Sequence, residues 1–151
     1  RALGYQVWVA RNDRSAPNCH GGQLGEGCAE ALPLAGLAPE VRSTVELIDV
    51  LWVEGTRIIC AFEVEKSTSI YSGILRLLDL SLSFPTEGPT LYLVAPDARE
   101  GEVRAQLTRP AFRDLVHRPA LIAFSDLERD CEALCRFGQN HEALRKLARV
   151  V

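Results

Sequence analysis

The sequence predicts an α/β domain with a mixed central sheet. Two apolar runs, residues 44–53 and 57–65, are separated only by Glu-Gly-Thr, which is typical of an antiparallel hairpin. Further along the chain, single strand-like runs alternate with segments of helical periodicity, as expected for parallel strands joined by crossover helices. At 151 residues the chain is long enough to form one domain with its own core.

The first strand is expected at residues 5–10, where apolar and polar residues alternate and strand-forming residues are frequent. Residues 11–39 are rich in Gly, Asn, Asp and Ser and read as a long loop, a feature that is often functional. Strands 44–53 and 57–65 follow. Both are apolar at nearly every position, which predicts central strands covered on both faces.

A helix is expected at residues 67–83. Ser67, Thr68 or Ser69 can cap its first turn, and the Pro-Thr-Glu-Gly-Pro segment that follows ends it. Apolar residues recur at helical spacing and predict one face against the sheet. They are Ile70, Ile74, Leu77, Leu78 and Leu82.

Residues 90–95 and 120–125 are the remaining predicted strands. Each is followed by an Asp or Ser with a Glu three residues later, the pattern of a capping box. The two boxes are Asp97 with Glu100 and Ser125 with Glu128. The helices expected are 97–107, a short one at Pro110, 125–137 and a last one at 140–151.

Composition excludes several classes of protein. Hydrophobic content of 47% and charged content of 25% are typical of a globular domain. No apolar run approaches the roughly 20 residues that span a bilayer, and no signal peptide is recognisable, so we expect a cytoplasmic protein without a membrane partner. A net charge of −3 gives no global attraction to nucleic acid, although a local basic patch can suffice.

The beginning of the chain suggests a fragment. It starts at Arg1, contains no Met and enters an apolar pattern at once. We therefore expect that an N-terminal portion of a longer chain is missing, and that this portion supplies a helix or an upstream domain as a partner.

The five cysteines do not predict a disulfide framework, because their number is odd and no secretory context is visible. Cys60 reads as a core residue. Cys131 and Cys135 share a helix face, and Cys19 and Cys28 lie in the Gly-rich loop. These four could form a zinc site, but their spacing fits no common zinc finger, and reduced thiols are the alternative.

Acidic residues mark the end of the second hairpin strand, in the stretch Cys-Ala-Phe-Glu-Val-Glu-Lys. Because side chains alternate along a strand, Glu63 and Glu65 share one face, and Val64 and Lys66 the other. Asp49 lies within the preceding strand. Pairing through residues 54–56 places Asp49 opposite residue 61, and a bulge or a longer register would bring it level with Glu63.

Three carboxylates in an apolar setting repel one another and resist ionisation. A hard divalent cation relieves this, and Mg²⁺ prefers oxygen ligands, water and phosphate. Such a metal activates water and stabilises the charge of a phosphodiester during cleavage. The alternative is a solvated strand end, with Asp49 paired to an arginine such as Arg57.

The order Asp49, then Glu63-Val64-Glu65 on the second strand of a hairpin, then a Ser/Thr-rich helix start, resembles the PD-(D/E)XK nuclease superfamily. The strand–strand–helix–strand order from residue 44 to 95 is similar to that superfamily's core as well. The resemblance implies a restriction-endonuclease-like fold, with a mixed central sheet flanked by helices. The phrases around these residues resemble uncharacterised bacterial proteins with such a domain.

Carried over residue by residue, the resemblance implies that Asp49, Glu63 and the backbone carbonyl of Val64 bind Mg²⁺ or Mn²⁺. Glu65 stands where the superfamily usually has Lys, so this is a Glu-x-Glu variant. Lys66 cannot simply replace that Lys, because it faces the other way. Some restriction enzymes of the superfamily carry an acid at this position.

The resemblance therefore implies a Mg²⁺-dependent endonuclease acting on DNA, with Asp49, Glu63 and Glu65 as catalytic residues. A homodimer is a further expectation. The alternative is a nuclease-fold binding or regulatory module without catalysis. The candidates for contact with nucleic acid are Arg11, Asn12, Arg14, Lys66, Ser69, Tyr71 and Arg76.

Overall fold

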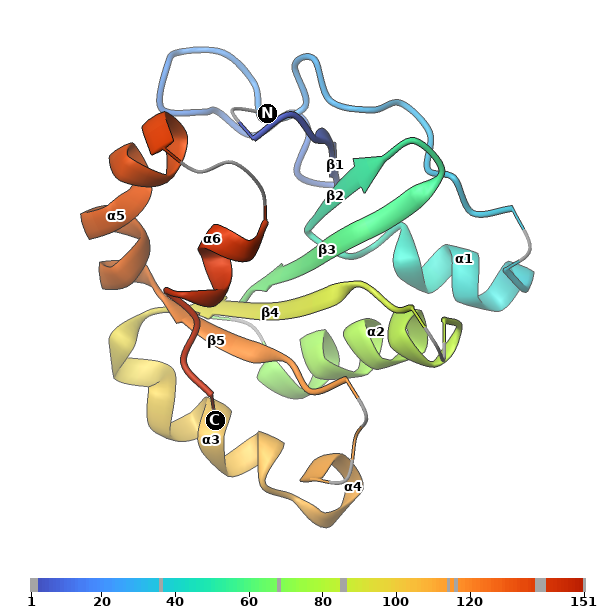
Figure 1. Ribbon diagram of the computed structural model, residues 1–151. Coiled ribbons are helices and arrows are strands. Elements are labelled where there is room, and N and C mark those ends of the chain that lie inside the picture. Colours follow the sequence, from blue (N-terminus) through green and yellow to red (C-terminus); the bar gives the residue numbers. More distant parts are fainter. Residues whose placement is uncertain are drawn as a thin grey trace.

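A five-stranded mixed sheet forms the centre of the protein (Figure 1). The strands lie in the sheet in their chain order; β1, β2 and β3 are antiparallel, whereas β3, β4 and β5 are parallel. The predicted hairpin and the predicted crossover connections are both confirmed. The strands are β1 Gln6–Val9, β2 Val50–Glu54, β3 Arg57–Val64, β4 Thr90–Ala95 and β5 Ala120–Ala123.

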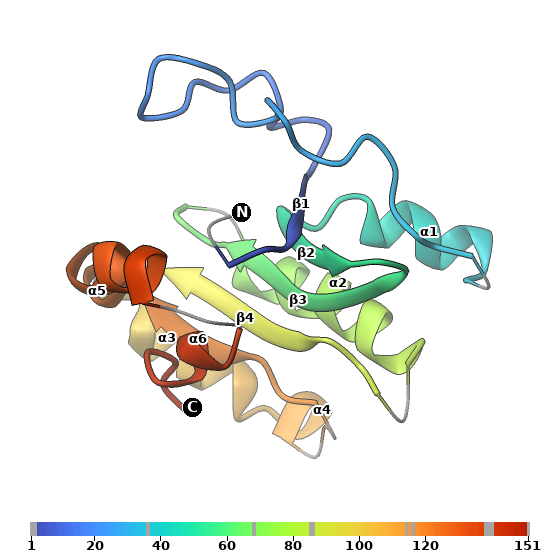
Figure 2. The ribbon, with the colours of Figure 1, turned by 45° about the horizontal axis from the view of Figure 1, so that its top comes forward.

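This computed structural model describes residues 3–35, 37–67, 69–84, 87–113, 115, 117–137 and 141–150. Helices cover both faces of the sheet (Figure 2). Helices α1 to α4 contribute to one hydrophobic cluster, and α5 and α6 contribute to the other. None of the helices in these ranges combines the length and the apolar composition needed to cross a membrane. The helical elements are α1 Pro39–Val45, α2 Ile70–Leu82, the 3₁₀ turn η1 Asp97–Arg99, α3 Glu100–Leu107, α4 Pro110–Arg113, α5 Phe124–Phe137 and α6 Glu142–Arg145.

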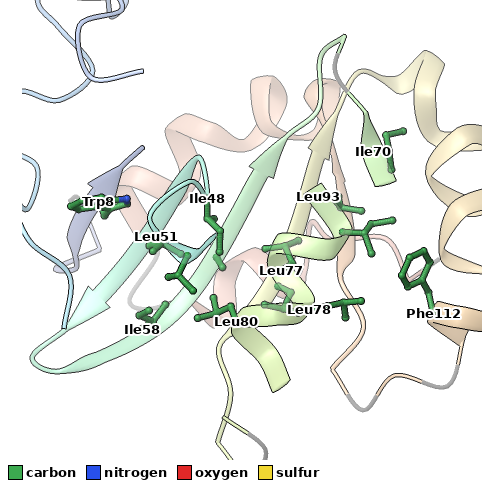
Figure 3. Close-up of a cluster of buried hydrophobic side chains, with 14 of the residues drawn as sticks. Trp8, Ile48, Leu51, Ile58, Ile70, Leu77, Leu78, Leu80, Leu93 and Phe112 are labelled. Atoms are coloured by element: carbon green, nitrogen blue, oxygen red, sulfur yellow. The ribbon is translucent and has the colours of Figure 1, made fainter. Parts of the chain in front are cut away.

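The two faces of the central strands fill two separate cores. Ala61 and Leu93 face the cluster that contains α2, while Phe62 and Tyr92 face the opposite cluster. Figure 3 shows side chains of α2, including Leu77, packed beside those that precede and begin β2. Burying one such side chain stabilises the fold by about 1.5–3 kcal/mol. Because side chains alternate along a strand, Glu63, which follows Phe62 in β3, points toward α2.

The predicted strand at residues 44–53 is wrong in its first half. Helix α1 occupies Pro39–Val45, and β2 begins only at Val50. Pro39 stands in the first turn of α1, where its missing N–H costs nothing. Val45 and Ile48 are fully buried in the α2 cluster, so packing outweighed the strand preference of this segment.

Neither predicted capping box forms. Asp97 lies in a 3₁₀ turn, and the end of β5 runs directly into α5 at Phe124. The Asp97 carboxylate instead accepts hydrogen bonds from the backbone N–H and the hydroxyl of Ser125, at 3.2 and 2.5 Å. Asp97 therefore caps α5 from outside, an arrangement that depends on the adjacency of parallel strands β4 and β5.

Helix α2 differs from its prediction at both ends. Ser69 holds the N-cap position, but its side chain makes no capping hydrogen bond. Thr68 lies outside the described residues. At the other end Leu82 is 72% exposed, whereas Ser81 is buried, so the apolar stripe ends at Leu80.

Candidate active site

The acidic end of β3 is buried on one side only. Glu63 and Glu65 are 0% and 1% exposed, whereas Val64 between them is 40% exposed. Lys66 is exposed as well. The predicted separation is thus confirmed: the two carboxylates enter the α2 side of the sheet, and the lysine does not.

Asp49 comes level with Glu63 through a bulge. The β2–β3 register shifts between Trp52 and Val53, so Val50 pairs with Phe62, and the position before Val50 lies beside Glu63. The Asp49 Oδ2 accepts a hydrogen bond of 2.7 Å from the Val64 backbone N–H. Asp49 stands just before β2 rather than within it. Two differences from the expected pairing align it with Glu63: Glu54 pairs with Arg57, which shortens the connection to residues 55 and 56, and the bulge shifts the register by one further position.

A pocket of about 680 Å³ opens at this point. Its walls come from the end of β1 and the following loop, the start of β2, the end of β3 and the first turns of α2. In Figure 2 the loop after β1 runs away from the sheet as a long blue segment. The lining residues are Val9, Asp13, Leu24, Asp49, Val50, Val64, Glu65, Ser69, Ser72 and Arg76.

Arg76 holds the side chain of Glu63. Its Nε and Nη2 donate hydrogen bonds of 2.8 and 2.5 Å to the two carboxylate oxygens. Burial nevertheless raises the pKa of Glu63 to about 7, against the lowering effect of the Arg76 hydrogen bond, and the charges of Asp49 and Glu65 raise it further. Ionisation of Glu63 is therefore more costly here than in water, and additional positive charge would favour it.

The surroundings of Asp49 also disfavour its ionised form. Burial raises its pKa above the ordinary aspartate value, and the hydrogen bond from Val64 and the charge of Arg76 oppose that shift. The charges of Asp13 and Glu65 raise it again. The pocket therefore gathers more negative charge than its one lining arginine neutralises among the described residues.

The close approach of α2 to β3 requires glycine at position 73. A Cβ at Gly73 would collide with the carboxylate of Glu65 and lie 3.3 Å from the Cβ of Glu63. Gly73 is buried on the α2 face that meets the strand. The Ser-Gly pair that follows the helix start therefore makes room for the two glutamates.

The predicted contacts with nucleic acid separate into two groups. Ser69 and Arg76 line the pocket, whereas Arg11 lies in a different pocket with Trp8, Glu30 and Arg42. The remaining candidates line neither pocket. Asn12 and Lys66 are exposed, and Tyr71 contacts Phe112 and Arg109. Arg14 donates to the carbonyls of Val9 and Ala29 and stacks on Trp8. The guanidinium of Arg14 therefore anchors the loop in this state, and its contact with DNA stays a prediction.

Sequence reasoning missed Asp13 and Arg99. Asp13 follows β1, which pairs with β2 so that Val9 lies beside Val50, close to Asp49. Arg99 follows β4 and donates a 2.7 Å hydrogen bond to the Glu65 carbonyl. Adjacent parallel strands end at the same edge of a sheet, so that rule could have placed Arg99 near the end of β3.

Carboxylate oxygens are available at the pocket, but the described side chains do not form a complete set of metal ligands. In the part of the chain that the structure describes, no group of three or more His, Cys, Asp or Glu side chains is placed to hold a metal ion. That statement covers Cys19, Cys28 and Cys131; the side chain of Cys135 lies outside it. The oxygen donors and the excess negative charge suit Mg²⁺ or Mn²⁺ in kind. Both Glu63 oxygens, however, are bonded to Arg76.

Comparison with known proteins identifies the family to which this chain belongs. A family model described as the Type II restriction enzyme NmeDI C-terminal domain matches residues 1–148, so this chain belongs to that family.

One curated relative is the Type II restriction enzyme NmeDI of Neisseria meningitidis serogroup C. It is 27% identical over 127 residues, which cover 75% of this chain and 34% of the relative. The chain therefore spans about a third of that relative's length. No solved structure matches the chain.

Proposed function

We propose that this chain is a divalent-metal-dependent nuclease domain that hydrolyses phosphodiester bonds in DNA. The observation that carries the proposal is the buried pair Glu63 and Glu65, with Asp49 aligned beside Glu63 in the β2–β3 pairing. Asp49 and Glu65 line one open pocket. Burying carboxylates is costly unless they are paired with a positive charge or coordinate a metal ion. The relative's description as a restriction enzyme supports DNA as the substrate.

A restriction-endonuclease-like fold of the PD-(D/E)XK kind is part of this proposal. The antiparallel β1–β2–β3 meander, the helix α2 and the parallel strand β4 agree with the expected core order. In this assignment Asp49, Glu63 and the Val64 carbonyl bind Mg²⁺ or Mn²⁺. When bound, such a metal activates water and stabilises charge on the phosphodiester.

The remaining groups act on water and substrate. Glu65, buried beside the same pocket, orients the attacking water or helps to hold a second metal. Ser69 and Ser72 line the pocket at the N-terminal end of α2, where their hydroxyls and the helix dipole favour a phosphate. Arg11 and Asn12, exposed after β1, can approach the DNA backbone further from the scissile bond.

The cleavage test uses plasmid DNA with Mg²⁺ or Mn²⁺, and compares the protein with Asp49→Asn. Loss of a metal ligand is expected to slow cleavage by at least about a hundredfold. Asp79→Asn is the matched control, because Asp79 is exposed on α2 and does not line the pocket. Cleavage by the protein that persists in Asp49→Asn would remove Asp49 from the site.

The second candidate is a binding or regulatory module that has the nuclease fold and no catalysis. One observation favours it: Arg76 bonds both oxygens of Glu63, the arrangement of a carboxylate that needs no metal. A calorimetric titration with Mn²⁺ distinguishes the two candidates. Heat from a single class of sites that Asp49→Asn abolishes supports the nuclease, and the absence of binding supports the module.

The larger context belongs to the same proposal. Because the chain covers only 34% of its curated relative, an upstream domain is an expected partner in DNA recognition. A homodimer also stays a prediction; it would place two such sites on the two strands of the DNA. A cytoplasmic location stays a prediction as well.

A further inference from the structure

Arg76 lines the pocket, so its side chain can contact a bound molecule as well as Glu63. Its helix α2 carries it to the pocket, where the side chain is 27% exposed while its partner Glu63 is 0% exposed. The carboxylate is therefore fixed within the protein, and the guanidinium stands at the boundary with solvent. Of these two groups, the guanidinium is the one with room to move.

The charges around Arg76 explain its position. The hydrogen bond from Arg76 to Glu63 raises the pKa of the arginine most, and the charges of Glu63, Asp49 and Glu65 raise it further, against the effect of burial. Lys66 is exposed and does not line the pocket. Among the described residues that line the pocket, Arg76 supplies the basic group.

A metal ion and Arg76 need the same atoms. The two oxygens of Glu63 accept from Nε and Nη2 of Arg76, so a metal that takes Glu63 as a ligand must displace at least one of these hydrogen bonds. Arginine cannot give up its proton to resolve the conflict. It must turn, and the open side of its position is the pocket that also holds Ser69 and Ser72.

We propose that Arg76 is a substrate-binding group that is stored on Glu63 in the metal-free protein and is released to the DNA phosphate when the metal binds. This inference rests on the proposed nuclease function. The guanidinium fork matches phosphate oxygens as well as it matches a carboxylate. Arg76 would then supply, from α2, the positive charge that is absent from position 65, directly after β3.

The proposal predicts that metal binding and cleavage respond in opposite directions to one substitution. Arg76→Met removes the competitor, so Mn²⁺ should bind about tenfold more tightly by calorimetry. It also removes the phosphate contact, so cleavage should be slower by about a hundredfold at saturating metal. Arg76→Lys should fall between, because lysine keeps the charge but loses the fork.

The matched control is Arg57→Met, which removes an exposed arginine that pairs with Glu87 far from the pocket. It should change neither quantity. Circular dichroism and thermal unfolding of each variant establish that it is folded, and Arg76→Lys serves if Arg76→Met is not.

Three outcomes are decisive. Tighter Mn²⁺ binding with slower cleavage supports the exchange. Metal binding in Arg76→Met or Arg76→Lys that is unchanged or weaker, in a chain whose parent binds metal and cleaves DNA, shows that Arg76 only positions Glu63 and overturns this inference alone. A parent protein that neither binds Mn²⁺ nor cleaves DNA overturns the proposed function and this inference with it.

Discussion

At the scale of single residues, Glu63 is a buried acid whose surroundings disfavour its ionised form. It is fully buried, and its pKa is raised to about 7 from an ordinary value near 4.5. A carboxylic acid whose pKa is higher in the folded state stabilises the fold below its unfolded pKa and loses that contribution as pH rises through the folded pKa. The metal-free protein should therefore lose stability between about pH 4.5 and pH 7.

Glu63→Gln should remove this dependence. The free energy of unfolding is measured by urea titration with a chelator present. Between pH 5 and pH 8 we expect it to fall less in the variant than in the parent, and the difference between the two falls to be on the order of 3 kcal/mol. Glu87→Gln is the control, because Glu87 is exposed and pairs with Arg57 at the opposite end of β3 from Glu63. Equal pH slopes for Glu63→Gln and the parent would show that Glu63 titrates normally.

At the scale of elements, the site depends on how closely α2 approaches β3. Gly73→Ala places a methyl group against the Glu65 carboxylate, which is itself enclosed. We expect DNA cleavage to fall by at least about tenfold, because displacement of a catalytic group by about 1 Å is costly. The roughly 1 kcal/mol that alanine usually contributes within a helix should also be lost to this clash.

Gly101→Ala is the matched substitution in α3, where a Cβ meets nothing within 4 Å. It should stabilise the protein by up to about 1 kcal/mol and leave cleavage unchanged. Thermal unfolding and a plasmid assay on both variants give the comparison. Full activity in Gly73→Ala would show that Glu65 tolerates displacement and is not part of the reaction.

The elements also show what the sequence could and could not predict. Strict alternation placed Glu63 and Glu65 together, since every side chain on a pleated strand obeys the same period. The alignment of Asp49 required the bulge at Trp52 and Val53, which no single residue type in the hairpin specifies. The residues around Val45 carry strand-forming side chains, and only packing against α2 makes them helical.

Contacts between distant segments were harder still to predict. Arg76 could be assigned to the less apolar side of α2, but its approach to Glu63 depends on the crossing of helix and strand. Asp13 reaches the pocket because β1 pairs with β2 in a particular register. Both contacts follow from tertiary arrangement, and each involves residues that local patterns describe only as polar.

At the scale of the whole molecule, the sheet joins two cores. Leu93 is buried in the α2 cluster beside Glu63, and Ile122 is buried in the opposite cluster. We expect Leu93→Ala and Ile122→Ala each to lower the free energy of unfolding by about 2–5 kcal/mol. Because the same strands carry both faces, unfolding should remain one transition in each variant.

Fluorescence and circular dichroism followed during urea unfolding test this prediction. Trp8 and Trp52 report on the two clusters, since Trp8 belongs to the α2 cluster and Trp52 packs against the other. Coincident transitions by both methods are expected. Separate transitions would show that the two faces unfold independently, and that the site is supported by one core alone.

In the metal-free protein, the guanidinium of Arg76 takes the place that the proposed metal ion would occupy beside Glu63. The most direct measurement is an anomalous difference map from a crystal of the protein grown with Mn²⁺. We predict a peak within coordination distance of Asp49, Glu63 and the Val64 carbonyl, with the guanidinium of Arg76 turned away from Glu63 toward the pocket. A map with no peak at this position, and with Arg76 still bonded to both oxygens of Glu63, would contradict the account.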